Sequence, residues 1–203
     1  MSVYQSNTEA LRAEIASAAA RMIAEDGADY GTAKRNAAKQ ILGDARVSGD
    51  LLPDNQQIED EVRLYNELFF ADSQPARLLH LRELALALME ELAPFNPHLT
   101  GAVLNGTAGE HSDIHLQLFP ESAKEVEIYL LNRNINFDVS ESATLSNRKQ
   151  PAETLSFIWK NEGVHLTIHE FDDLRSARQP GSGKRIERAN TDTIRNLILP
   201  DSY

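Results

Sequence analysis

One short stretch, residues 104–116, is the densest cluster of polar residues that could take part in chemistry. It reads Leu-Asn-Gly-Thr-Ala-Gly-Glu-His-Ser-Asp-Ile-His-Leu. Asp113 and His115 alternate with apolar residues, and this period of two predicts a strand with both polar side chains on one face. A carboxylate and an imidazole on one face are suitable ligands for a divalent metal ion. The residues from Gly106 to Ser112 predict a short turn between two strands.

A second group of polar side chains lies further along the chain. Residues 154–159 and 164–168 predict a hairpin, joined by a turn that ends in a glycine. The alternation within 164–168 places His165 on the face opposite its apolar residues. Asp138, on a predicted strand at 135–139, and Glu170, just after the hairpin, are additional carboxylates.

The first stretch resembles the nucleotidyltransferase superfamily, which has the polymerase-β-like fold. Its members show a Gly-Ser turn after a first strand and an acid-x-acid pair on the next strand. By this resemblance, Gly106 and Thr107 occupy the turn, and Ser112 precedes the first acid, Asp113. His115 stands where the second acid would be, and the spacing from Gly106 to Asp113 is shorter than is usual for the family.

The resemblance implies the chemistry as well as the fold. In the family, the acids hold magnesium on the phosphates of a nucleoside triphosphate. A third acid comes from a later strand, which implies Asp138 in the smaller members and the hairpin position of His165 in the larger ones. We therefore expect Asp113, His115 and Asp138 as catalytic residues, and Asp113, His115, His165 and Glu170 as metal ligands. Magnesium prefers oxygen ligands, whereas imidazole suits zinc or manganese, so the expected ion is Mg²⁺ or another divalent metal such as Mn²⁺ or Zn²⁺.

The main basic residues lie near the C-terminus. Lys184 and Arg185 could neutralise the triphosphate tail, while Gly106 and Thr107 would cradle its phosphates. Ser112 completes the expected cofactor-binding residues. The segment Gly181–Lys184 lacks the upstream glycine of a phosphate-binding P-loop, so we interpret it as a flexible basic loop.

Each of these residues also has an ordinary interpretation. A single histidine on a strand, such as His115, is most often a packed or surface residue. Asp113 could cap a turn at the start of its strand, and Gly106 could be a simple turn glycine.

The remaining pattern predicts an α+β fold. Helical periodicity predicts helices over residues 8–25, 30–42, 55–71 and 73–92, and later over 122–132 and 191–199; strands are predicted over 102–104, 113–119, 135–139 and the hairpin. This order predicts a helical N-terminal region, residues 1–73, and a nucleotidyltransferase-like domain, residues 74–203. The domain is expected to contain a mixed or antiparallel sheet with helices on one face.

Composition excludes several classes of protein and site. The chain has no cysteine, so it has no disulfide, thiolate metal site or cysteine nucleophile. It shows neither a secretory signal nor an apolar run long enough to span a membrane, so we expect a cytoplasmic protein with no membrane partner. The net charge is −11, and residues 1–95 hold 16 of the acids against 9 of the basic residues. This acidic charge disfavours nucleic acid as a partner of the N-terminal half.

Two functions remain open from the sequence. The first is an enzyme that transfers a nucleoside monophosphate from a nucleoside triphosphate to an unknown acceptor with a divalent metal. The second is a catalytically inactive protein of the same fold that binds a ligand or another protein. The helical half could bind a protein partner through Tyr65, Phe69 and Phe70, or could simply pack on the sheet domain.

Overall fold

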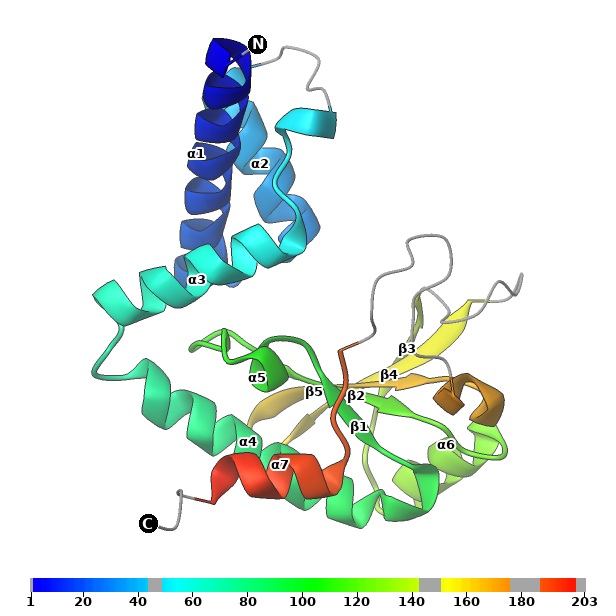
Figure 1. Ribbon diagram of the computed structural model, residues 1–203. Coiled ribbons are helices and arrows are strands. Elements are labelled where there is room, and N and C mark those ends of the chain that lie inside the picture. Colours follow the sequence, from blue (N-terminus) through cyan, green and yellow to red (C-terminus); the bar gives the residue numbers. More distant parts are fainter. Residues whose placement is uncertain (1, 44–48, 143–150, 176–186, 200–203) are drawn as a thin grey trace. The chain divides into compact units, whose positions relative to one another are not determined.

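The computed structural model describes residues 2–43, 49–142, 151–175 and 187–199 (Figure 1). The chain forms two compact units. The helical unit comprises residues 1–77 together with 107–111, and the sheet unit comprises residues 78–106 and 112–203. The first boundary falls four residues after the one expected from the sequence. The assignment of residues 107–111 to the helical unit has no counterpart in the sequence pattern.

The helical unit contains the helices α1 (Ser2–Asp26), α2 (Tyr30–Leu42) and α3 (Asn55–Phe69), a short 3₁₀ turn η1 (Gly49–Leu51) and the start of α4 (Gln74–Glu91). Two helices begin at aspartates, since Asp29 accepts a hydrogen bond from Thr32 N and Asp54 forms a capping box with Gln57. The core of the unit consists mostly of small side chains, which allow helices to approach closely: Ile15, Ala16, Ala19, Ala20, Ala33, Ala37, Ala38, Ile58 and Val62.

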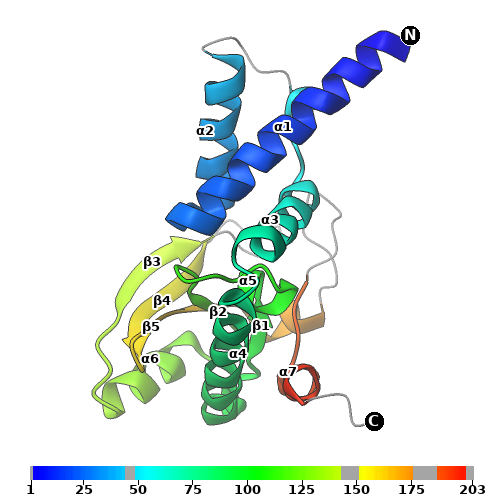
Figure 2. The same ribbon diagram turned by 90° about the vertical axis from the view of Figure 1, so that its left-hand side faces the viewer.

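The sheet unit contains five strands in the order β1-β2-β5-β4-β3 (Figures 1 and 2). The strands are β1 (His98–Thr100), β2 (Ile114–Leu118), β3 (Asp138–Ser142), β4 (Ala152–Trp159) and β5 (Glu162–Ile168). β2 and β5 are parallel and the other pairs are antiparallel, so the sheet is mixed. The expected α+β fold, with its helical N-terminal part and mixed sheet, is confirmed.

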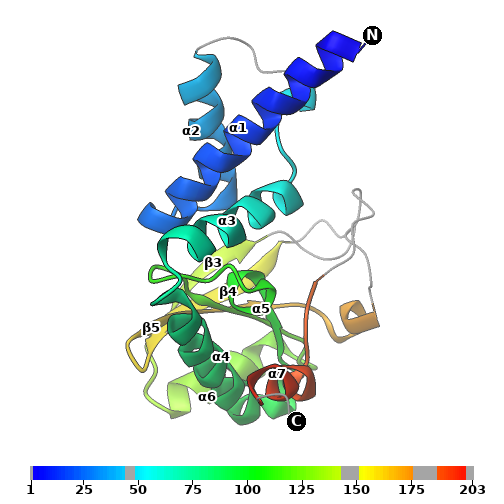
Figure 3. The same cartoon turned by 60° about the vertical axis from the view of Figure 1, so that its left-hand side comes forward.

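The two faces of the sheet differ in polarity. α4 and α6 (Ala123–Asn132) lie on the same side of it (Figures 1 and 3), and their buried side chains are apolar. The strand residues on that face are also buried, among them Ile114, Leu116 and Leu166. α7 (Thr191–Ile198) contacts β1 and follows Ala189, whose backbone exchanges two hydrogen bonds with Leu99. The strand residues that alternate with these buried ones have their side chains on the opposite face of the sheet, and they are mostly polar.

The predicted strand at 102–104 is wrong. These residues lie in a short helix, α5 (Gly101–Asn105), between two glycines with positive φ, Gly101 (+71°) and Gly106 (+87°). Three consecutive apolar residues do not distinguish a strand from a buried helical turn. The first strand is instead β1, directly before Gly101. Short 3₁₀ turns complete the unit at η2 (Ala93–Phe95) and η3 (Phe171–Arg175). In the part of the chain that the structure describes, no helix has the length and apolar character needed to cross a membrane.

Candidate functional site

A row of polar residues crosses all five strands on one face of the sheet. Strand pairing aligns Thr100 with His115, His115 with His165, His165 with Ser156, and Ser156 with Asp138. Residues aligned across a ladder project to the same face, so these five side chains share it. We call this set the polar row. The sequence predicted three of its members as site residues, namely His115, His165 and Asp138.

The strongest interactions at the row join two of its members, His165 and Ser156, to Asp113, the residue just before β2. The Nε2 of His165 lies 3.0 Å from Oδ2 of Asp113, and its Nδ1 lies 2.8 Å from the hydroxyl oxygen of Ser156. A carboxylate can only accept, so Nε2–H donates to Asp113; in the neutral ring, Nδ1 then accepts from the Ser156 hydroxyl. Both ring nitrogens of His165 are therefore occupied. The side chains of His165 and Asp113 still expose 29% and 45% of their surface.

His115 stacks on His165 beside this hydrogen-bonded chain. The two ring centroids are 4.6 Å apart and the planes differ by 17°. Desolvation by the surrounding protein lowers the pKa of His115, and the neighbouring His165 lowers it further, while Asp113 raises it. His115 is consequently neutral at pH 7. Its imidazole forms no hydrogen bond with any residue that the structure describes, although its carbonyl oxygen accepts from the Thr100 hydroxyl, and the residue is exposed.

Gly163 provides the space that Asp113 occupies. A Cβ atom at position 163 would lie 2.2 Å from Oδ1 and 2.5 Å from Cγ of Asp113, which is far closer than non-bonded atoms approach. Gly163 is the second residue of β5 and pairs with Ile158 of β4. A side chain here would push the carboxylate away from His165, so Gly163 positions Asp113.

The glycine that directly follows the first strand is Gly101, and the next residue is Ala102. A Cβ at Gly101 would lie 3.9 Å from Cδ2 of His115, so this turn borders the polar row. Gly106 instead ends α5, five residues later. Arg82 donates to the carbonyl oxygens of Val103 and Leu104 at the end of that helix. Burial lowers the pKa of Arg82, which nevertheless stays protonated.

The other predicted turn residues fall into different parts of the chain. Thr107 is 4% exposed and belongs to the helical unit, where Asn66 donates to its carbonyl oxygen. Ser112 is the first residue after the chain returns to the sheet unit. Lys184 and Arg185 lie outside the residues that the structure describes.

The structure separates two predicted carboxylates from Asp113. Asp138 lies two strands from His165, which corresponds to about 10 Å at the usual strand spacing. Glu170 lies beyond the C-terminal end of β5, five residues after His165. By the rise of a strand, this corresponds to about 15 Å from His165. Neither is at the distance at which it would share one metal ion with Asp113.

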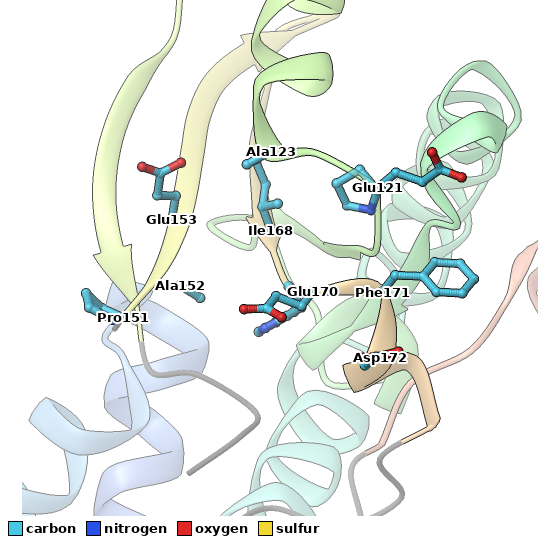
Figure 4. Close-up of a pocket in the computed structure, with 11 residues that line it drawn as sticks. Glu121, Ala123, Pro151, Ala152, Glu153, Ile168, Glu170, Phe171 and Asp172 are labelled. Atoms are coloured by element: carbon cyan, nitrogen blue, oxygen red, sulfur yellow. The ribbon is translucent and has the colours of Figure 1, made fainter. Parts of the chain in front are cut away.

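Glu170 lines a separate hollow of about 520 Å³ in the sheet unit. Glu121, Glu153 and Glu170 surround this hollow, and Phe171 and Asp172 lie beside it (Figure 4). The neighbouring His169 is 5% exposed and stacks on Phe119. Burial lowers the pKa of His169 to about 4; Asp173 opposes the shift and Arg188 adds to it.

The residues of the polar row do not fit the magnesium site that the resemblance implies. That site needs two neighbouring carboxylates, but Asp138, the carboxylate of the row, lies two strands from His165, and Asp113 accepts a hydrogen bond from His165. Both nitrogens of His165 are already bonded, so it could bind a metal only by giving up one of these partners. Across the described ranges, no three histidine or acidic side chains are arranged to hold a metal ion.

Three residues of this site were missed by the sequence analysis. Ser156 and Gly163 lie on the predicted hairpin, where only the strand register shows that they adjoin His165 and Asp113. The sequence did contain a signal for Gly101 as the glycine after the first strand. It follows His98-Leu99-Thr100, and its spacing to Asp113 is longer than that of Gly106, which is shorter than is usual for the family.

Comparison with known proteins gives no further information. No model of a protein family matches the chain, and no curated protein is similar enough to count as a relative.

Proposed function

We propose that this protein binds a nucleotide on the polar row of a nucleotidyltransferase-like sheet, without the magnesium-dependent transfer of that family. The absence of magnesium-dependent transfer is inferred from one observation. Asp113, the only carboxylate at the acid-x-acid position, is hydrogen-bonded to His165, whose other nitrogen is bonded to Ser156. In a transferase this carboxylate would bind a metal ion, whereas here it accepts a hydrogen bond from an imidazole.

The chemistry of the row supports a nucleotide as the ligand. The exposed ring of His115, stacked on His165, offers a flat aromatic surface, and nucleobases stack on such rings. Thr100, Ser156 and Asp138 add hydrogen-bonding groups on the same face. Gly101, beside His115, leaves the backbone open to a closely approaching group. The resemblance of residues 106–115 to the nucleotidyltransferases points to the same ligand class.

Calorimetric titration tests both halves of the proposal. ATP, GTP, CTP and UTP are titrated in EDTA, in magnesium and in manganese, and pyrophosphate release is measured in parallel. We expect one of them to bind equally well in EDTA and in magnesium, without pyrophosphate release. His115→Ala should weaken binding at least tenfold, because it removes the stacking surface.

The control is Ile128→Ala, which shortens an exposed side chain of α6 outside the row. Metal-dependent binding with pyrophosphate release, lost in Asp113→Ala, would show that the protein is a transferase. Failure of all four triphosphates to bind would exclude nucleotides as the ligand.

A further inference from the structure

The chain passes through the helical unit on its way to the candidate site. It leaves the sheet unit after Gly106 and returns at Ser112, and the five residues between belong to the helical unit. We call residues 107–111 the site loop, because Asp113 follows its end by two residues. The site loop is therefore a covalent link between the helices and the carboxylate that His165 holds.

Three side chains of the helical unit hold the backbone of the site loop. Asn66 donates to the carbonyl oxygen of Thr107 at 3.3 Å, and Gln74 donates to that of Ala108 at 2.8 Å. Arg77 donates to the carbonyl oxygen of Glu110 at 3.2 Å. These donors come from α3 and from the first turn of α4. Thr107 and Ala108 are almost completely buried, at 4% and 0% exposure.

The last residue of the loop, His111, is held by close packing. His111 packs against Gly27, the residue after α1, where a Cβ would lie 2.6 Å from Cβ of His111. Gly27 has φ of +67°, so a side chain here would meet both a steric clash and a strained backbone. The loop is consequently fixed at both ends by the helical unit, through α3 and α4 at one end and α1 at the other.

We propose that the helical unit regulates the candidate site through the site loop. While the helices hold residues 107–111, Ser112 and Asp113 are fixed at the start of β2 and Asp113 reaches His165. When the helices release the loop, Asp113 is free to leave His165, and the polar row loses its fixed carboxylate. The biological meaning of this regulation rests on the proposed function: a partner that binds the helices would change the affinity of the polar row for its nucleotide. Coupling is reciprocal, so a ligand on the row would also tighten the loop.

The test uses the full chain and needs no nucleotide, so its outcome is independent of the proposed function. The first variant is Gln74→Ala, and the second is Arg77→Met, which removes a bond at the exposed end of the loop. Two quantities are measured: amide hydrogen exchange of residues 107–116, and the imidazole nitrogen chemical shifts of His165. The matched control is Tyr65→Phe, which removes a hydrogen bond from Tyr65 to Glu25 within the helical unit and leaves the loop contacts intact.

We expect each loop variant to raise exchange across residues 107–111 by about fivefold to tenfold, the effect of losing one hydrogen bond. The nitrogen shifts of His165 should move toward those of Asp113→Ala, while the control leaves both quantities unchanged. Faster exchange with unaltered His165 shifts would overturn the proposal, because the loop would then open without disturbing the site. Unaltered exchange in both variants would overturn it too, because the helices would not be what holds the loop.

Discussion

Asp113 and His165 are 52 residues apart in the chain, and their side chains are joined by a 3.0 Å hydrogen bond. This contact depends on two features of the sheet. The parallel pairing of β2 with β5 places His115 beside His165, and the missing side chain of Gly163 leaves room for the carboxylate. Removing either partner should therefore change the electrostatic environment of the ring stacked beside them, His115.

The pKa of His115 should respond in opposite directions to its two neighbours. Asp113→Asn removes the negative charge that raises this pKa, so the pKa should fall further below its ordinary value. His165→Asn removes the neighbouring imidazole, whose interaction with His115 lowers this pKa, so the pKa should rise. NMR titration of the His115 ring between pH 4 and 8 measures both. Shifts of the same sign in the two variants would contradict the geometry described here.

Gly163→Ala should destabilise the protein by about 1–3 kcal/mol, because the new methyl group overlaps the Asp113 carboxylate. Urea unfolding at pH 7 measures the loss. Gly49→Ala is the control, since a Cβ there would meet nothing within 4 Å. If the two variants unfold at the same urea concentration, Asp113 does not occupy the space beside Gly163.

Arg82→Met should cost about 1–3 kcal/mol, because it leaves two backbone carbonyls at the end of α5 without their donor. Methionine preserves most of the aliphatic length, so the comparison isolates the guanidinium. Thermal or urea unfolding provides the measurement, with Arg63→Met on α3 as a control for the loss of a surface arginine. An equal effect of both substitutions would mean that Arg82 does not support α5.

The buried His169 should make stability dependent on pH. Its folded pKa of about 4 lies below the unfolded value of about 6.5, so between these pH values the unfolded chain binds the additional proton. The free energy of unfolding should be fully retained above pH 6.5 and decrease by about 2–3 kcal/mol as the pH falls toward 4. His169→Phe should reduce this acid-side loss, as measured by urea unfolding at pH 7, 6 and 5. An unchanged pH slope in the variant would show that His169 is not the group responsible.

The sequence determined the local elements and the faces of the strands. Helical periodicity located α1 to α4, and the alternation of residues 113–119 and 164–168 correctly placed His115 and His165 on polar faces. These patterns are readable because a helix or strand that must bury one side repeats its apolar residues at a fixed local period. The short apolar run at 102–104 was too brief to show a period, and it was misread as a strand.

Tertiary structure decided which polar side chains meet. The pairing of β2 with β5 sets a register between segments about 50 residues apart, and a shift of one residue would turn every side chain to the other face. That register aligns His115 with His165, and the pairing of β4 with β5 aligns His165 with Ser156. The positions of β3 and of the end of β5 keep Asp138 and Glu170 away from Asp113. The inclusion of residues 107–111 in the helical unit is also a tertiary result. It depends on donors from α3 and α4 that meet the loop only after the chain has folded, and no local pattern encodes such contacts.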